Sequence, residues 1–261
     1  MLFLSSVTSP LNAQTWANSE LTVFAAASLT EAFQTLGKAF EATHTPVKVS
    51  FNFGGSQQLV QQIVQGAKAD IFASANMKQM ETAVESAVID TATIRIFARN
   101  RLVMILPKNN PAHLENMKDL ARPEIKIVLA DSSVPAGQYA VQVLENCSKA
   151  REFGPSFREE VTRNVVSYEE NVRAVLSKVR LDECDAGIVY SSDIANDSLH
   201  ELLRINIPDQ FNIVAEYPIA IVHETRSSQI AKEFLEFVCS GDGGNVLSKF
   251  GFMSVNRTIK R

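Results

Sequence analysis

Short apolar segments alternate along most of this chain with longer stretches in which apolar residues recur every three or four positions. The first pair shows the pattern. Residues 21–27 are almost wholly apolar, and residues 28–44 place Leu29, Phe33 and Phe40 on one face of a helix. The pattern predicts buried strands that alternate with amphipathic helices, which is typical of parallel sheets covered by helices rather than of all-β or all-α proteins.

The same alternation predicts the other elements. Strands are expected at residues 47–53, 69–75, 101–107, 125–131, 186–190 and 216–222. Helices are expected at residues 56–66, 78–87, 136–150, 170–180 and 228–240, followed by a glycine-rich helix stop and turn at 241–244 and a terminal segment at 246–252.

Two of these strands, 101–107 and 216–222, flank a stretch that has its own strands and helices. This predicts two α/β lobes that are connected by two crossover strands, with a ligand cleft between them. Lobe 1 would comprise residues 20–100 and 215–261, and lobe 2 would comprise residues 101–214. The alternative is one continuous doubly wound sheet.

The first nineteen residues are assigned to neither lobe. Residues 1–13 combine an apolar stretch with small residues, as the second half of a secretory signal peptide does, but no lysine or arginine precedes Lys38. Residues 1–19 are therefore interpreted as the remnant of a signal peptide or as a disordered N-terminus.

The amino-acid composition narrows the classes of function that this chain can have. The chain has 261 residues, of which 46% are hydrophobic and 21% charged, and this favours a globular protein. A net charge of −4 with scattered basic residues excludes a nucleic-acid footprint. Cys147, Cys184 and Cys239 lack the spacing of a metal or redox motif. We interpret them as buried small apolar residues, or as one bridging pair if the chain is exported, with the pair left open.

The motifs of common enzymes are missing from the sequence. The four histidines are dispersed, and none belongs to an HExxH motif. The segment closest to a nucleophile elbow, residues 54–58, lacks the second glycine of GxSxG. Because no dinucleotide or P-loop motif occurs either, no catalysis is expected.

What recurs is a strand that ends in small residues, followed by a helix that begins with a hydroxyl or a glycine. Ser28, Ser56, residues 134–137 and residues 171–172 occupy four such positions, two in each proposed lobe. A helix start offers unpaired N–H groups and a partial positive charge, so four starts that face one cleft would form an anion cage. No lysine or arginine is expected at any of the four.

Each candidate also has a purely structural interpretation. Ser28 stands three residues before Glu31, as in a capping box, so its hydroxyl would serve only the helix. The helix near residue 172 would be capped either by Ser167 or by Asn171. Tyr190 ends a buried strand, where its phenol would either reach the anion or belong to the core.

Several segments together resemble a known family. They are VFAAASLTEAF, FNFGGSQQLVQQI, ADIFASA, VPAGQYA, ENVRAVL, AGIVYSSD, EYPIAIV and KFGF, in that order over roughly residues 20–254. The chain resembles the molybdate-binding proteins of bacterial ABC importers. It departs from them at Gly54 and Gly55, where small hydroxyl residues were expected.

The resemblance implies the class II periplasmic binding-protein fold and the capture of molybdate or tungstate for a membrane permease. It further implies a monomer in the periplasm, without a cofactor. Ser28 and Ser56 would supply hydroxyls and amides, Ala136 and Val172 amides, and Tyr190 its hydroxyl. No side chain is expected to bind the metal atom directly, although Glu169 and Glu170 leave the alignment open.

Three other functions stay open. The first is a binding protein for sulfate, thiosulfate or phosphate. The second is an enzyme on the same two-lobed fold, such as a hydroxymethylbilane synthase, although the cysteines lie away from the expected cleft. The third is the sensing half of a transcription regulator, but residues 1–20 are too few for a helix-turn-helix.

Overall fold

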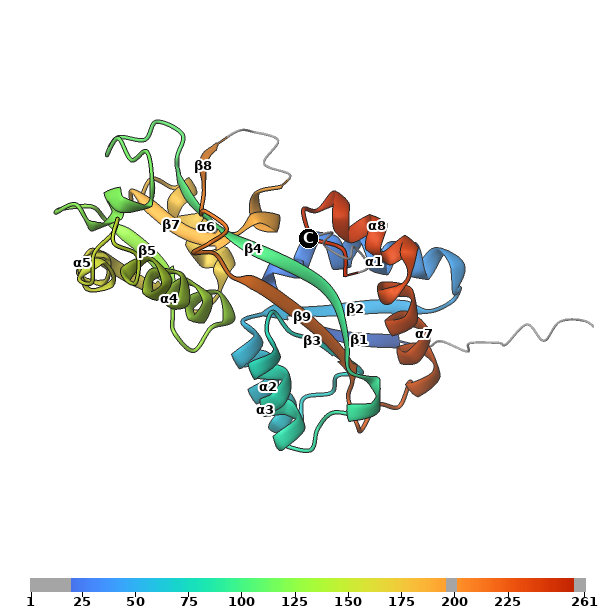
Figure 1. Ribbon diagram of the computed structural model, residues 1–261. Coiled ribbons are helices and arrows are strands. Elements are labelled where there is room, and N and C mark those ends of the chain that lie inside the picture. The colour runs from blue at the N-terminus through green and yellow to red at the C-terminus, as the bar shows by residue number, and fades with distance from the viewer. Residues whose placement is uncertain (1–19, 196–200, 256–261) are drawn as a thin grey trace, which may run out of the picture.

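Two long strands run through the middle of the structure and connect its two halves (Figure 1). The computed structural model describes residues 20–195 and 201–255. Strands β4 (Arg95–Pro107) and β9 (Val214–Ile221) pair antiparallel, from Arg95 opposite Ile219 to Arg101 opposite Val214. Beyond this region β4 continues into the other half, where it pairs with β7 and β8, so both halves share this strand.

The first half, which corresponds to the proposed lobe 1, carries three parallel strands next to β9. They are β1 (Glu20–Ala26), β2 (Lys48–Gly54) and β3 (Ile71–Ala73). Its helices are η1 (Ala27–Leu29), α1 (Thr30–Thr43), α2 (Ser56–Val64), α3 (Met77–Glu85), η2 (Thr91–Thr93), α7 (Ser228–Cys239) and α8 (Gly241–Lys249).

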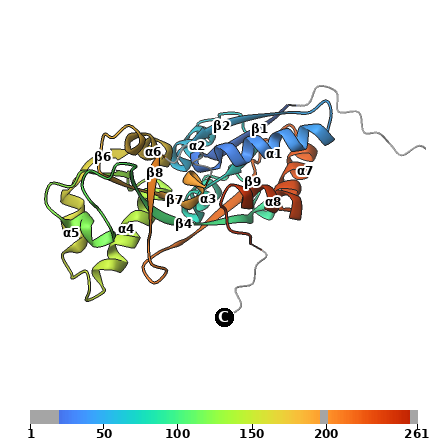
Figure 2. The same ribbon diagram turned by 90° about the horizontal axis from the view of Figure 1, so that it is seen from above.

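The second half corresponds to the proposed lobe 2. Its strands are β5 (Ile127–Ala130), β6 (Val165–Glu169), β7 (Ala186–Tyr190) and β8 (Leu202–Asn206), and its helices are η3 (Met117–Ala121), α4 (Pro135–Ser148), α5 (Phe157–Arg163), α6 (Val172–Arg180) and η4 (Ser191–Ile194). The strand order across both halves is β2-β1-β3-β9-β4-β7-β5-β6, with β8 alongside β4. Figure 2 shows the two halves side by side from above.

The predicted α/β fold with two strands that cross between the halves is confirmed. The proposed boundaries near residues 100 and 215 fall within β4 and at the start of β9. One expectation needs correction, because β4 and β9 run antiparallel to their neighbours, whereas β1, β2 and β3, as well as β5, β6 and β7, pair in parallel. The signal-peptide interpretation lies outside the described residues.

Helix α5, strands β6 and β8 and the short helices η2, η3 and η4 were not predicted, and one segment was predicted wrongly. Helix α5 has only seven residues, and strands β6 and β8 contain no fully buried residue, so none of these three elements shows a strong apolar run. The glycine-rich segment at 241–244 is not a helix stop. Ser240 accepts a hydrogen bond from the N–H of Gly243 through its side chain, and this cap starts α8 at Gly241.

The core of the first half is built on the amphipathic face of α1. Phe33 and Phe40 are fully buried and pack edge-to-face against Phe234 of α7, with ring centroids 6.4 and 5.2 Å apart. Fully burying such side chains stabilises the fold by about 1.5–3 kcal/mol each. This packing holds α1, and therefore its start beside β1, in a fixed place.

A close approach also fixes the start of α4 on the end of β5. A Cβ atom built on Gly137 would lie 2.0 Å from the carbonyl oxygen of Asp131 and 2.4 Å from that of Ala130. Both neighbours are backbone atoms, which cannot move aside as a flexible side chain can. Only glycine therefore permits this distance between α4 and β5.

We predict that Gly137→Ala destabilises the protein by about 1–3 kcal/mol or more, because the helix start must move away from β5. The matched control is Gly244→Ala in α8, where no atom lies within 4 Å of the new Cβ and the gain in helix propensity is up to about 1 kcal/mol. Denaturant unfolding of both variants measures the difference. Equal stabilities would contradict the prediction.

Candidate functional site

All five residues that the sequence predicted as ligand contacts line one small cavity between the two halves. The cavity takes residues from both halves and contains no charged side chain. It is lined by Ala26, Ala27, Ser28, Gly54, Gly55, Ser56, Ala75, Val134, Pro135, Ala136, Asn171, Val172 and Tyr190. The structure therefore brings Ser28, Ser56, Ala136, Val172 and Tyr190 together.

The sheet topology explains why these positions meet. Each lies just after or at the carboxyl end of a strand: β1, β2, β5, β6 and β7. Parallel strands put their carboxyl ends at the same edge, and the helices that follow them begin there. The crossover strands then place the two edges opposite each other (Figure 1).

The starts of α4 and α6 supply backbone amides from the second half. Pro135 is the first residue of α4 and has no N–H, so Ala136 is the first residue of this helix that can donate. Asn171 caps α6, where its Oδ1 accepts the N–H of Ala174 at 3.0 Å. The N–H of Val172 belongs to the first turn and has no partner within the helix.

Asn171, and not Ser167, is therefore the cap of α6. The Ser167 hydroxyl instead donates to the carboxylate of Glu169, at 2.5 Å. Glu169 also pairs with Lys178 at 2.8 Å, and hydrogen bonds from Lys178 and Ser167 hold its pKa below the usual value although burial opposes this. Neither Glu169 nor Glu170 lines the cavity.

The capping interpretation of Ser28 is wrong. Ser28 lies inside η1, is 4% exposed, and makes no cap hydrogen bond at the start of α1. Its Oγ lies 3.1 Å from the hydroxyl of Tyr217 on β9, which is 189 positions away. The hydroxyl is thus held at the cavity wall by a residue that the sequence analysis did not select.

Ser56 is the first residue of α2 and is also buried. Its Oγ accepts the N–H of Ala75 at 3.1 Å, and its own proton remains available for a cavity acceptor. Gly55 beside it could not carry a side chain, because a Cβ there would lie 2.7 Å from the carbonyl oxygen of Glu170 in the other half. This close approach explains the glycine where a hydroxyl residue was expected.

Tyr190 contributes a buried phenol without a partner. Its hydroxyl has no hydrogen bond to any residue that the structure describes, although the side chain is almost completely buried. Its ring packs at 67° to that of Tyr217, with centroids 5.6 Å apart. Burial raises the pKa of Tyr190 well above its usual value, so the group stays a hydrogen-bond donor. An acceptor in the cavity would satisfy it.

Neutral side chains at the starts of α2 and α3 reach across from the first half to the second. Gln57 donates to the carbonyl oxygen of Glu170, and Gln58 donates to the carboxylate of Glu170, each at 3.0 Å. Asn76 donates to Gln138 at 3.1 Å, and Gln79 to the carbonyl of Ser133 at 3.4 Å; these two contacts connect α3 with the start of α4. These four hydrogen bonds hold the two halves against each other beside the cavity.

Comparison with known proteins agrees with this geometry. A family model described as "Bacterial extracellular solute-binding protein" matches residues 21–253. The chain belongs to this family. Among curated relatives of this solute-binding protein is the "Molybdate-binding protein ModA" of Mycobacterium bovis, with 33% identity over 89% of this chain and 84% of the relative.

Solved structures that are similar to this chain include binding proteins for the same kind of ligand as the curated relative. The "substrate binding domain of putative molybdenum ABC transporter from Clostridium difficile" is 31% identical, with a TM-score of 0.67, over 91% of this chain and 100% of that one. The molybdate-binding protein of Azotobacter vinelandii shares the fold, with a TM-score of 0.77 and 19% identity over 89% of this chain and 98% of that one. The resemblance predicted from the sequence is confirmed.

One expectation about charge in this solute-binding protein needs correction, because Arg173 is the second residue of α6, directly after Val172. Its guanidinium does not line the cavity. It donates to the carbonyl of Ala27 at 3.3 Å, pairs with Glu31 across the lobes, and lies 3.8 Å from Asp193. Two carboxylates therefore surround this cation, and the cavity itself has no lysine or arginine.

Asp193 lies directly behind Tyr190. Its Oδ2 accepts the backbone N–H of Tyr190 at 2.9 Å, which fixes the end of β7, while its Oδ1 has no hydrogen-bond partner among the described residues. Burial raises the pKa of Asp193 to about 7, although Arg173 acts in the opposite direction. The sequence analysis missed this residue, and its position in the η4 turn gave no signal of burial.

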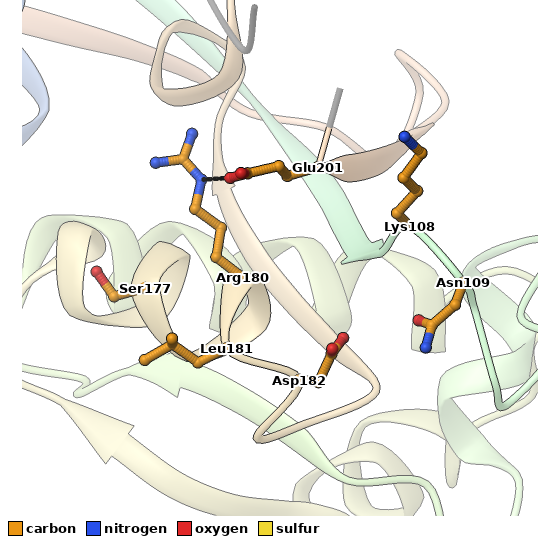
Figure 3. A pocket seen from close by; sticks show the side chains of 7 residues that line it. All are labelled: Lys108, Asn109, Ser177, Arg180, Leu181, Asp182 and Glu201. Carbon is orange, nitrogen blue, oxygen red and sulfur yellow. Dashed lines mark ion pairs between the residues drawn. The ribbon is translucent and has the colours of Figure 1, made fainter. Parts of the chain in front are cut away.

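Figure 3 shows a hollow elsewhere on the solute-binding protein. Its accessible volume is about 710 Å³. It is lined by Lys108, Asn109, Ser177, Arg180, Leu181, Asp182 and Glu201. Arg180 faces Glu201 at 3.9 Å, and Leu181 is 68% exposed. The hollow belongs to the second half alone and opens to solvent, so it is not the candidate site.

The described residues contain no cluster of three or more histidine, cysteine, aspartate or glutamate side chains that could hold a metal ion. Within residues 20–195 and 201–255, no helix is both long and apolar enough to cross a bilayer.

The three cysteines, all of which the structure describes, do not form a disulfide. Cys147, Cys184 and Cys239 are free thiols, and burial raises the pKa of each, to about 11, 12 and 11 respectively.

The raised pKa of Asp193 predicts a pH dependence of stability. Between about pH 4 and pH 7 the folded protein keeps the proton that the unfolded chain releases, so the free energy of unfolding falls as pH rises through this window. Asp193→Asn removes the titrating group. Its thermal midpoint should therefore fall less between pH 5 and pH 7.5 than that of the wild type.

Circular dichroism melts of the ligand-free proteins measure this difference. Asp242→Asn, which changes an exposed carboxylate in the first turn of α8, controls for the loss of one charge. Identical pH slopes for Asp193→Asn and the wild type would show that the folded-state pKa is not raised.

Proposed function

We propose that this solute-binding protein captures molybdate, or tungstate, as a tetrahedral oxyanion and delivers it to the membrane permease of an ABC importer. The observation that carries the proposal is one cavity without charged side chains, lined by the five predicted donor residues from two lobes. The molybdate-binding and molybdenum-transporter names of its relatives support the same ligand. The roles of the five residues toward the anion are part of this proposal.

The donors in the cavity match an anion without a counter-charge. Ser28, Ser56 and Tyr190 carry hydroxyls, and Ala136 and Val172 carry amides at helix starts. A hydrogen bond to a charged group is worth about 1.5–3 kcal/mol. Several of them together offset the cost of removing the anion from water, and the partial positive charge of the helix starts adds to this.

Ligand size should determine selectivity. The donors are held by two helix starts, a buried hydroxyl pair and a packed phenol, so their spacing cannot adjust freely. A cage of fixed donors fits one size of tetrahedral anion best. Molybdate and tungstate would bind alike, and the smaller sulfate and phosphate would bind more weakly.

The protein would release the ligand chemically unchanged. The residues that line the cavity include no histidine, cysteine or carboxylate, so neither serine hydroxyl has a base beside it in the cavity. Membership in an extracellular solute-binding family supports a place outside the cytoplasm, and for this chain we propose the periplasm. We further propose that it works as a monomer without a cofactor.

Calorimetric titration tests the proposal directly. We expect sodium molybdate and sodium tungstate to bind with a Kd in the micromolar range or tighter, and sodium sulfate at the same ionic strength to bind at least about a hundredfold more weakly. Comparable affinities for sulfate and molybdate would refute the assignment and leave a general oxyanion binder.

Tyr190→Phe removes one proposed donor without changing the ring. The loss of one hydrogen bond to the anion should weaken molybdate binding by about ten- to a hundredfold. The thermal midpoint of the ligand-free protein should not fall, because the hydroxyl has no partner to lose among the described residues.

Tyr168→Phe is the matched control. Tyr168 lies on β6 with 52% of its surface exposed, away from the cavity lining. Removing the hydroxyl of Tyr168 should leave both the affinity for molybdate and the stability of the protein unchanged. If the two variants bound molybdate equally well, Tyr190 would have no part in holding the ligand.

A further inference from the structure

A buried chain of polar groups runs from the cavity into the crossover strands. It starts at Ser28 Oγ, continues 3.1 Å away at the hydroxyl of Tyr217 on β9, and reaches Asn100 on β4, whose Nδ2 lies 3.5 Å from that hydroxyl. Asn100 and Tyr217 are 0% exposed and are not among the residues that line the cavity. The predicted binding set includes neither of them.

The orientation of the Asn100 amide is determined by its neighbours. Its Oδ1 receives the backbone N–H of Arg101 at 2.9 Å, and a backbone N–H can only donate. The hydroxyl of Ser191 also donates to this oxygen, at 3.1 Å. The Nδ2 group must therefore face the other way, toward Ser192 Oγ at 2.8 Å and the hydroxyl of Tyr217.

This orientation favours one direction for the hydrogen bond that follows. Because Tyr217 accepts from Asn100, its own proton is free to be donated to Ser28 Oγ. In this direction Ser28 accepts the proton. Its own proton is consequently not used within the chain and points to the cavity that Ser28 lines.

We propose that Tyr217 and Asn100 are positioning residues for ligand binding: they orient the Ser28 hydroxyl so that it donates to the bound oxyanion. Without them Ser28 could equally present a lone pair to the cavity, which would repel an anion oxygen. The inference rests on the proposed function, because it assumes that an oxyanion occupies the cavity.

Two further features fit this role. Burial raises the pKa of Tyr217 well above its usual value, so its phenol keeps the proton that the chain needs. The chain also ends at Ser191 and Ser192, which directly follow Tyr190. It therefore connects a hydroxyl of the first lobe, through both crossover strands, with the segment that carries the phenol of the second lobe.

A double-mutant cycle tests the proposal. Molybdate titrations are carried out on the wild type, Ser28→Ala, Tyr217→Phe and the double variant, each shown to be folded by circular dichroism at the titration temperature. We expect a loss of about three- to tenfold for Tyr217→Phe, a larger loss for Ser28→Ala, and no additional loss in the double variant, because Tyr217 acts only through the Ser28 hydroxyl.

Tyr139→Phe is the control for changes in aromatic packing. Tyr139 packs against the ring of Tyr190 with centroids 6.5 Å apart, but it takes no part in the chain and does not line the cavity. Its affinity should match that of the wild type. A second probe, Asn100→Asp, replaces the donating amide by an accepting carboxylate and should weaken binding more than Tyr217→Phe does.

The outcomes separate the relay from the proposed function. If the wild type binds molybdate and the losses of Ser28→Ala and Tyr217→Phe multiply in the double variant, Tyr217 acts independently of Ser28 and the relay is wrong. Unchanged affinity in Tyr217→Phe would have the same meaning. A wild type that does not bind molybdate would instead overturn the proposed function, and the relay with it.

Discussion

The proposed function depends on how a buried anion can be balanced without a cation beside it. Orphan N–H groups at helix starts offer the answer, provided that several of them point at one place. Parallel strands meet this condition because their carboxyl ends lie at one edge, and α1, α2, α4 and α6 all begin near such an edge. Neither lobe surrounds the cavity alone. The antiparallel pair of β4 and β9, which belongs to both lobes, is therefore as much a part of the site as the residues that line it.

Behind the cavity wall, polar side chains hold the donors in place. Tyr217 contacts the hydroxyl of Ser28, and Asp193 accepts the backbone N–H of Tyr190. Arg173, which directly follows the cavity residue Val172, is occupied by Glu31 and Asp193 and by the carbonyl of Ala27. This arrangement keeps a full positive charge off the cavity, so that any anion of the wrong size or shape gains little from electrostatics alone.

The parts of the fold that could be predicted from the sequence are those in which a local pattern carries the information. The apolar face of α1 and the small-residue ends of β1 and β2 are such patterns, and they led to Ser28 and Ser56. Tyr217, Asn100 and the glutamines that reach across the lobes could not be found in this way. Their partners on other elements, in the contacts described above, lie between 54 and 189 positions away, and only the packed fold brings them together.

Edge elements were missed for a related reason. Strand β6 lies at the end of the sheet and leaves Val166 and Tyr168 exposed, so it has no continuous apolar run. Arg173 was visible in the sequence directly after Val172. Its pairing with Glu31 was not, because that contact exists only where the two lobes meet.

The contacts between the lobes have a consequence for the time that the proposed ligand would stay bound. Separating the lobes breaks the contacts of Gln57, Gln58, Asn76 and Gln79 with the second half. The dissociation rate of an anion held by both lobes would then be governed by how often the lobes separate, and not by the strength of any single hydrogen bond to the anion. A membrane partner that gripped both lobes and held them apart would thus empty the site quickly, whatever the equilibrium affinity of the free protein.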